Sequence, residues 1–187
     1  MISNINALIA KLDTQGDIAA EKVIAELAEI GKAAVPALIK AAKDESAPRI
    51  RKWSLQALGS IGDKRAAPLL IQSLDDSRMT VKLHSIKGLS RMKYAKSANK
   101  IAELLTDKSG GIRVNALYAL MEIGDDSFLP KIQKCLSDPQ WYVRQNACLA
   151  CEKFRAKKAK KKLKQLSRSD AKKAVREAAK KALAAFD

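Results

Sequence analysis

The stretch IRKWSLQALGSIGD, residues 50–63, decides the fold. Its apolar residues recur every three or four positions, which is the spacing of one face of an α-helix. Pro48 lies just before the stretch and suits the first turn of a helix, whereas Gly62 suits the position just after the last turn. The stretch therefore predicts an amphipathic helix that begins near Pro48 and ends near Ile61.

The same pattern returns at a nearly constant interval. A β-branched residue followed by a base begins at residues 50, 81, 112, 143 and 175, so the intervals are 31, 31, 31 and 32 residues. An aspartate precedes each pair and an apolar residue lies ten positions beyond each base. The pair Ile30-Gly31 extends this register to the N-terminus, where it indicates a sixth, divergent unit. A period of this length is the mark of a repeat architecture.

Each unit contains a second, preceding helix. Val35, Leu38 and Ala42 have helical spacing, and the segment 44–48 between them and the quoted stretch is rich in acidic and small residues and ends in proline. Nothing in the chain alternates with the period of two that a half-buried strand requires. Each unit is thus a helical hairpin whose apolar side is buried only when neighbouring hairpins stack.

These residues resemble the HEAT-like repeat family, in the short form known from phycobilisome lyases. The family pattern, Pro-x-Leu, then Asp, then Val-Arg-x-x-Ala-Ala-x-Ala-Leu-Gly-x-Ile-Gly-Asp, matches Pro36-Ala37-Leu38 followed by residues 50–63. The chain departs from it at Lys82, which replaces arginine, and at Lys93, which replaces the closing glycine. The resemblance implies an all-α fold, a right-handed α-α superhelix (solenoid) of about six helical hairpins. It also implies one solenoid over 1–187, with 1–33 as a divergent capping repeat and 156–187 as a lysine-rich capping repeat.

Composition limits the class of protein. The chain has 187 residues, 47% of them hydrophobic but only 4% aromatic, as suits packed helices with an aliphatic core. No apolar run approaches the roughly 18 residues that span a bilayer, and the N-terminus does not resemble a secretory signal. Three cysteines are too few to staple the chain, which predicts a reducing, cytoplasmic location. The protein is also expected to be a monomer without membrane contact.

The repeated acids and bases predict a structural ladder. In the family these residues are understood to bond between neighbouring units, so the resemblance implies this role here. Repetition in every unit suits a ladder and not a catalytic site. The predicted ladder consists of Asp76, Lys82, Asp107, Arg113, Asp138 and Arg144.

A second set is predicted to face the inner, concave surface. Its members lie two, five and nine positions beyond each ladder base, at helix positions that the core does not claim, and exposed Trp, Tyr and Arg there would anchor a partner. Trp53, His84, Asn115 and Asn146 would form one row. The predicted binding residues are Trp53, Gln56, His84, Lys87, Arg91, Asn115, Tyr118, Asn146 and Lys153.

Charge predicts the kind of partner. The net charge is +16, with an excess of +7 over residues 49–93 and +9 over residues 156–187. Six lysines fall within eight residues and predict a basic patch that attracts polyanions, either an acidic protein or the phosphates of a nucleic acid. These are Lys157, Lys158, Lys160, Lys161, Lys162 and Lys164.

Three functions compete on this evidence. The favoured one is a non-enzymatic scaffold that binds an anionic macromolecule. A second is an enzyme similar to the HEAT-like alkylpurine DNA glycosylases, with which the chain shares its basicity, Trp53 and Trp141. A third is a chromophore lyase or chaperone, as the repeat pattern of phycobilisome lyases implies.

No cofactor, metal or small-molecule substrate is predicted. Cys148 and Cys151 form one pair on a helix, whereas a zinc site needs four ligands. Three repeats earlier their places are taken by Leu55 and Leu58. This register predicts that both thiols lie in the core.

Overall fold

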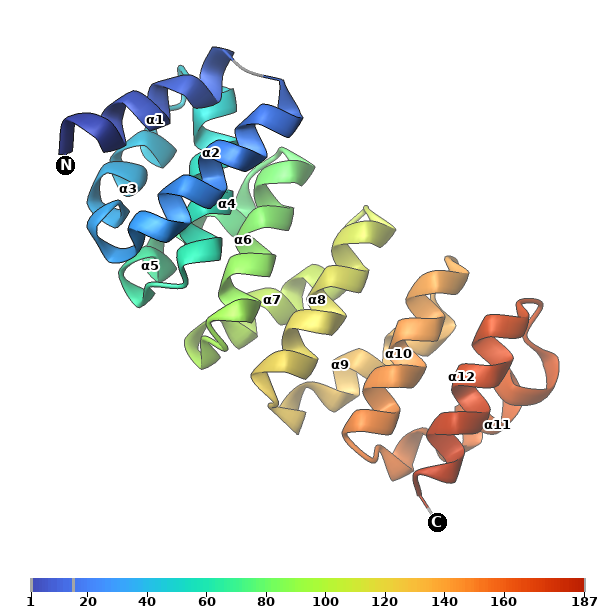
Figure 1. Cartoon of the computed structure of the whole chain (residues 1–187). Coiled ribbons are helices and arrows are strands. Elements are labelled where there is room, and N and C mark those ends of the chain that lie inside the picture. The colour runs from blue at the N-terminus through green and yellow to red at the C-terminus, as the bar shows by residue number, and fades with distance from the viewer. Residues whose placement is uncertain (1, 15, 187) are drawn as a thin grey trace. The chain divides into compact units, whose positions relative to one another are not determined.

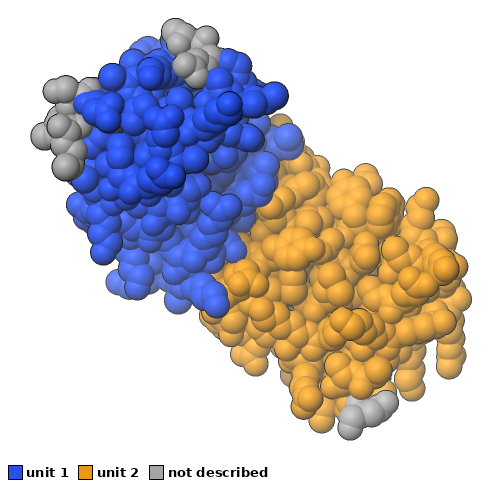
Figure 2. All heavy atoms as spheres, in the orientation of Figure 1, with its two compact units in different colours: residues 1–97 blue, residues 98–187 orange. Residues whose placement is uncertain are grey.

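The computed structural model describes residues 2–14 and 16–186 (Figure 1). Over these residues the chain forms α-helices joined by short 3₁₀ turns, and they contain no strand. The helices follow one another as six pairs. The chain divides into two compact units, residues 1–97 and 98–187 (Figure 2). Each unit contains three of the described helix pairs. The predicted all-α fold of six hairpins is confirmed.

Unit 1 is built from three hairpins. Their second helices contact one another in sequence, because α4 packs against both α2 and α6. The first helix of the chain, α1, also contacts α4, the second helix of the next hairpin. The helices are α1 (Ile2–Thr14), α2 (Asp17–Ile30), α3 (Val35–Lys43), α4 (Pro48–Ile61), α5 (Ala67–Gln72) and α6 (Met79–Arg91).

Unit 2 repeats this arrangement. Here α10 packs against both α8 and α12, so the second helices again form a row. Each first helix packs against the second helix of its own hairpin. The helices are α7 (Ala98–Glu103), α8 (Gly110–Ile123), α9 (Leu129–Lys134), α10 (Trp141–Lys153), α11 (Lys160–Ser169) and α12 (Lys173–Ala184).

The helix ends follow from local sequence. Helix α4 has proline in its first turn, and Gly62 after its last turn has φ 73° and donates its N–H to the carbonyl of Leu58. Gly124 ends α8 in the same way, with φ 80°. These two glycine caps are confirmed. Lys93 and Arg155 hold the equivalent positions and also have positive φ, 46° and 47°, a conformation that strains any residue with a Cβ.

The core is aliphatic and rich in alanine. Leu55 and Leu58 are completely buried in α4, and Cys148 and Cys151 are completely buried at the equivalent places in α10. Burial raises the pKa of both thiols to about 12, so they are protonated and pack as small apolar groups. The predicted core position of these cysteines is confirmed. None of the described helices is long and apolar enough to cross a membrane.

Candidate functional site

The acids and bases of the repeat pattern are joined across neighbouring hairpins. In unit 2, the Nε and Nη2 atoms of Arg113 donate to the two carboxylate oxygens of Asp138, both at 2.7 Å. Its Nη1 donates to the carbonyl of Asp107 at 2.8 Å. Arg113 is 8% exposed, and the hydrogen bond to Asp138 raises the pKa of its guanidinium. One side chain thus connects the turns of two hairpins.

The next pair has the same geometry. Arg144 donates to both carboxylate oxygens of Asp170, at 2.7 and 2.9 Å, and to the carbonyl of Asp138 at 2.8 Å. The guanidinium of Arg144 lowers the pKa of the Asp170 carboxyl. Both side chains thus hold the turns of neighbouring hairpins together.

In unit 1 the carboxylate of Asp76 is shared. Arg51 donates to it at 2.7 Å across the hairpins, and Arg78 donates from two positions further along the chain at 2.9 Å. The hydrogen bond from Arg78 is the main cause that lowers the pKa of Asp76 to about 2. Arg78 lies outside the repeat pattern and was not predicted, and the predicted ladder also left out Arg51 and Asp170, although both follow that pattern. Asp107 takes part in the ladder through its backbone carbonyl, whereas the place of Lys82 in the ladder stays a prediction.

Trp53 requires a correction. It was expected on an exposed surface, but it is only 4% exposed. The ammonium of Lys52 lies 3.6 Å from the centre of its ring, and the His84 ring lies 6.1 Å away. His84 belongs to α6, which packs on α4 from the following hairpin. Trp53 is therefore a core residue and not an exposed anchor, and a DNA glycosylase-like use of its ring has no support here.

The two asparagines of the predicted row point back to their own helices. Asn115 donates its amide to the carbonyl of Gly111 at 2.8 Å, and Asn146 donates to that of Tyr142 at 2.7 Å. Asn146 is also buried, with 8% of its surface exposed. Its place on a binding surface is a second correction, whereas Asn115 remains half-buried.

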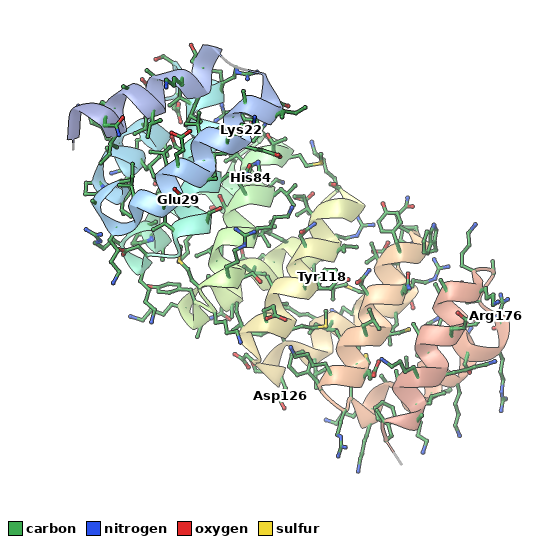
Figure 3. The ribbon with its side chains drawn as sticks, in the orientation of Figure 1. Lys22, Glu29, His84, Tyr118, Asp126 and Arg176 are labelled. Carbon is green, nitrogen blue, oxygen red and sulfur yellow. The ribbon has the colours of Figure 1, made fainter. Side chains whose placement is uncertain are left out.

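Four of the predicted residues do come together in unit 1. Gln56, His84, Lys87 and Arg91 line a cavity of about 90 Å³ between α4 and α6, together with Gly59 and Gly88. His84 lies on α6 beside this cavity (Figure 3). Burial, together with the positive charges of Lys52 and Lys87, lowers the pKa of His84 to about 4. The imidazole is therefore neutral at pH 7, and its charged neighbours are cations.

In unit 2 the corresponding surface is different. Tyr118 lies on α8 (Figure 3). Its side chain is 47% exposed. Lys153 forms an ion pair with Glu122 at 3.7 Å across α10 and α8. A further pair, Lys181 with Glu152 at 3.0 Å, joins α12 to α10. The cations on these helices are thus partly neutralised by the unit's own carboxylates.

The lysine patch, residues 157–164, lies on α11 and the turn before it. Lys157, Lys158, Lys160, Lys161 and Lys164 are exposed, whereas Lys162 is half-buried and donates to the amide of Gln165 at 3.3 Å. Leu163 and Leu166 bury the opposite face of the helix. The six lysines form no ion pair with a carboxylate among the described residues. The patch is therefore an uncompensated positive surface.

Three larger cavities recur at the turns. They measure about 600, 340 and 310 Å³ and are lined by the pairs Arg113–Asp138, Arg51–Asp76 and Arg144–Asp170, respectively. Because each lies at the same place in a pair of neighbouring hairpins, these notches are a property of the stacking. The described residues contain no cluster of three His, Cys, Asp or Glu that could hold a metal ion.

Comparison with known proteins identifies the family. A family model described as HEAT repeats matches residues 5–90 and 99–184. The chain belongs to the HEAT repeat family. No curated protein sequence matches it at a significant level.

Several solved structures share the fold of this HEAT repeat protein. YibA of Escherichia coli is 22% identical with a TM-score of 0.75, over 93% of this chain and 67% of that one. The complex of CpcE and CpcF of phycocyanin lyase from Nostoc is 23% identical with a TM-score of 0.66, over 93% and 74%. A designed armadillo repeat protein in complex with the peptide (KR)4 is 18% identical with a TM-score of 0.67, over 97% and 98%.

Proposed function

We propose that this HEAT repeat protein is a non-enzymatic scaffold that binds an acidic partner protein through two basic surfaces. One is the lysine patch on α11. The other is the surface between α4 and α6 of unit 1, where Lys87 and Arg91 border the cavity. The single observation that carries the proposal is the uncompensated charge of the lysine patch. Such a field attracts an anionic partner and accelerates its encounter.

Two observations favour protein over nucleic acid. The second-helix row of unit 1 also includes α2, which carries Asp17, Glu21, Glu26 and Glu29, and these acids would repel a continuous phosphate backbone. An acidic protein carries its carboxylates at separate points, so it can place them on the basic surfaces and away from the acids of α2. In addition, the structurally similar armadillo design is in complex with a peptide. That peptide is basic, whereas this scaffold is itself basic and is therefore expected to bind a peptide of negative charge.

The chemistry of the described side chains supports a role without catalysis. His84 is the single histidine of the chain, and the charges that shift its pKa are those of Lys52 and Lys87. A general base instead needs a group that orients it and a proton to take. The cysteine thiols are buried and protonated, so they are not nucleophiles.

The test is fluorescence anisotropy with a labelled glutamate-rich peptide, at about 50 and about 300 mM salt because exposed charges are screened over this range. A charge-reversed variant of the patch, Lys157→Glu with Lys160→Glu and Lys164→Glu, is compared with a control that reverses the exposed Lys40, Lys64 and Lys96. Both variants change the net charge equally. We expect the patch variant to lose more affinity than the control by about tenfold at low salt.

Two results would contradict the proposal. Equal losses in both variants would mean that binding reflects net charge and not the patch. Tighter binding of random duplex DNA than of the peptide, at the same salt concentration, would replace the acidic protein by a nucleic acid.

A further inference from the structure

The cavity between α4 and α6 exists because two glycines bring these helices together. A Cβ added to Gly59 would lie 2.8 Å from the Cα of Gly88, so the two backbones touch. No side chain can occupy the space beside this contact from either glycine. The four polar side chains around it, those of Gln56, His84, Lys87 and Arg91, border the cavity that results.

In unit 2, the positions equivalent to these two glycines are occupied by residues with side chains. Two repeats later, Met121 stands at the position of Gly59 and Ala150 at that of Gly88. Both are buried, at 6% and 0% exposure. The cavity of unit 1 is therefore a departure from the repeat and not one of its regular features.

The charges around this place also depart from the repeat. In unit 2, Lys153 pairs with the carboxylate of Glu122. Arg91 and Ser60 are the equivalent residues of unit 1, and there Arg91 donates only to the hydroxyl of Ser60, at 3.2 Å. Lys87 corresponds to the uncharged Leu149. At these positions unit 1 thus carries one cation more than unit 2 and lacks the carboxylate that pairs with the cation there.

Other groups around the cavity point the same way. Lys52 adds a third positive charge close to His84, and its acidic partner Asp17 is 3.9 Å distant and is shared with Arg49. Within the described part of unit 1, neither Lys87 nor Arg91 forms an ion pair with a carboxylate. The side-chain oxygen of Gln56 is buried without a hydrogen-bond partner, but it is an acceptor, so contacts to an anion fall to Arg91 and Lys87.

We propose that this cavity is a subsite for one carboxylate group, the side chain of an aspartate or glutamate of the bound partner, held by Arg91 and Lys87. The inference rests on the proposed scaffold function and locates one of its contacts. The guanidinium of Arg91 supplies the paired N–H groups that match a carboxylate. A cavity of about 150 Å³ accommodates benzene, so the 90 Å³ found here suits a smaller group such as a carboxylate.

The single histidine provides a direct readout in the intact protein. A carboxylate beside His84 favours the imidazolium form, so binding raises the pKa of His84 from about 4. The experiment follows the ring protons of His84 by NMR as a glutamate-rich peptide with an amidated C-terminus is added. We expect the resonances to shift on binding and their titration to move to higher pH. A glutamine-rich peptide with a free C-terminus tests the other source of a carboxylate and is expected to leave them unchanged.

Two variants test the assignment by exchanging residues between the units. Ser60→Glu introduces a carboxylate opposite Arg91. This carboxylate is equivalent to that of Glu122, which lies opposite Lys153 in unit 2. We expect it to raise the pKa of His84 without peptide and to weaken peptide binding about tenfold. The reverse exchange in unit 2, Glu122→Ser, is the matched control and leaves binding within about twofold. Ser60 and Glu122 are both exposed, and melting curves verify that each variant folds.

The outcomes separate this inference from the proposed function. If the peptide binds but His84 does not respond, and Arg91→Gln binds as tightly as the unchanged protein, the subsite is wrong while the scaffold stands on its lysine patch. If the glutamine-rich peptide shifts His84 and the amidated peptide does not, the ligand is a terminal carboxylate and the side-chain assignment fails. If the unchanged protein binds no acidic peptide, the scaffold proposal fails as well.

Discussion

Replacing Arg113 by alanine is expected to destabilise the protein by about 3 kcal/mol, because breaking a buried ion pair from one side leaves the other charge without compensation. The side chains of Arg113 and Asp138 are 10% and 8% exposed. The substitution removes two hydrogen bonds to that carboxylate and the bond to the carbonyl of Asp107. The carboxylate keeps the backbone N–H of Gln140, at 2.8 Å. This remaining bond places the expected cost near the lower end of the usual range of about 3–5 kcal/mol.

The chain contains a matched control for this substitution. Arg176 holds the same repeat position in α12 (Figure 3) and donates to the carbonyls of Asp170 and Ala171. No carboxylate among the described residues accepts from it. Arg176→Ala therefore removes backbone bonds without leaving a buried charge, and we expect a cost of about 1 kcal/mol.

Urea denaturation followed by circular dichroism measures both variants, and a thermal scan accompanies it. For a chain of this size, a change of 1 kcal/mol moves the melting temperature by about 2–4 °C, so Arg113→Ala is expected to lower it by roughly 6–12 °C. A double-mutant cycle with Asp138→Ala isolates the pair. Equal losses for the Arg113 and Arg176 variants, or a coupling energy near zero, would refute the structural role of the pair.

Three further predictions concern single positions. Lys93→Gly removes a side chain from a backbone with φ 46° and is expected to raise the free energy of unfolding by about 0.5–1 kcal/mol, measured by urea denaturation. His84 has a pKa of about 4 when folded, below the ordinary value of 6.5 for a histidine, so its contribution to stability is complete above pH 6.5 and falls as pH drops towards 4. His84→Gln should abolish this fall in a series of denaturation curves. Cys148, with its pKa raised to about 12, should react with iodoacetamide at pH 8 only when the protein is denatured, as mass spectrometry of the labelled chain would show.

Each of these has a clear contrary outcome. A destabilised Lys93→Gly variant would mean that contacts of the lysine side chain outweigh its backbone strain. A pH profile that His84→Gln leaves unchanged would assign the pH dependence to other groups. Rapid labelling of the native protein would show that α10 opens readily around the thiol.

Much of the fold follows from the spacing of residues along the chain. The helix positions, the glycine caps at Gly62 and Gly124, and the core places of Cys148 and Cys151 depend on neighbours within a few residues or on the repeat register. The residues of the pairs between neighbouring hairpins also follow the repeat, because each base and each acid returns at the same interval, whereas Arg78 does not. The stacking of neighbouring hairpins then determines which acid each base contacts.

The candidate site was predicted less completely. Position in the repeat placed Gln56, His84, Lys87 and Arg91 on one surface, and they do border one cavity. The same reasoning was wrong for Trp53 and Asn146, because it counts positions along one helix and takes no account of the neighbouring helices that pack against that helix. The cavity itself was also missed, although the helical glycines at positions 59 and 88 were a signal for it.

Sequence alone determined that this protein is built of helical hairpins that stack on their neighbours, because the period of the apolar residues gives each hairpin an apolar side that it cannot bury alone. Tertiary structure decided which of the surface positions remain accessible and where an unfilled space lies between cations. The physical reason is that the exposure of a side chain depends on the distance to the neighbouring helix. At Gly59 and Gly88 that distance is set by a contact between two backbones from different repeats, which no local pattern encodes.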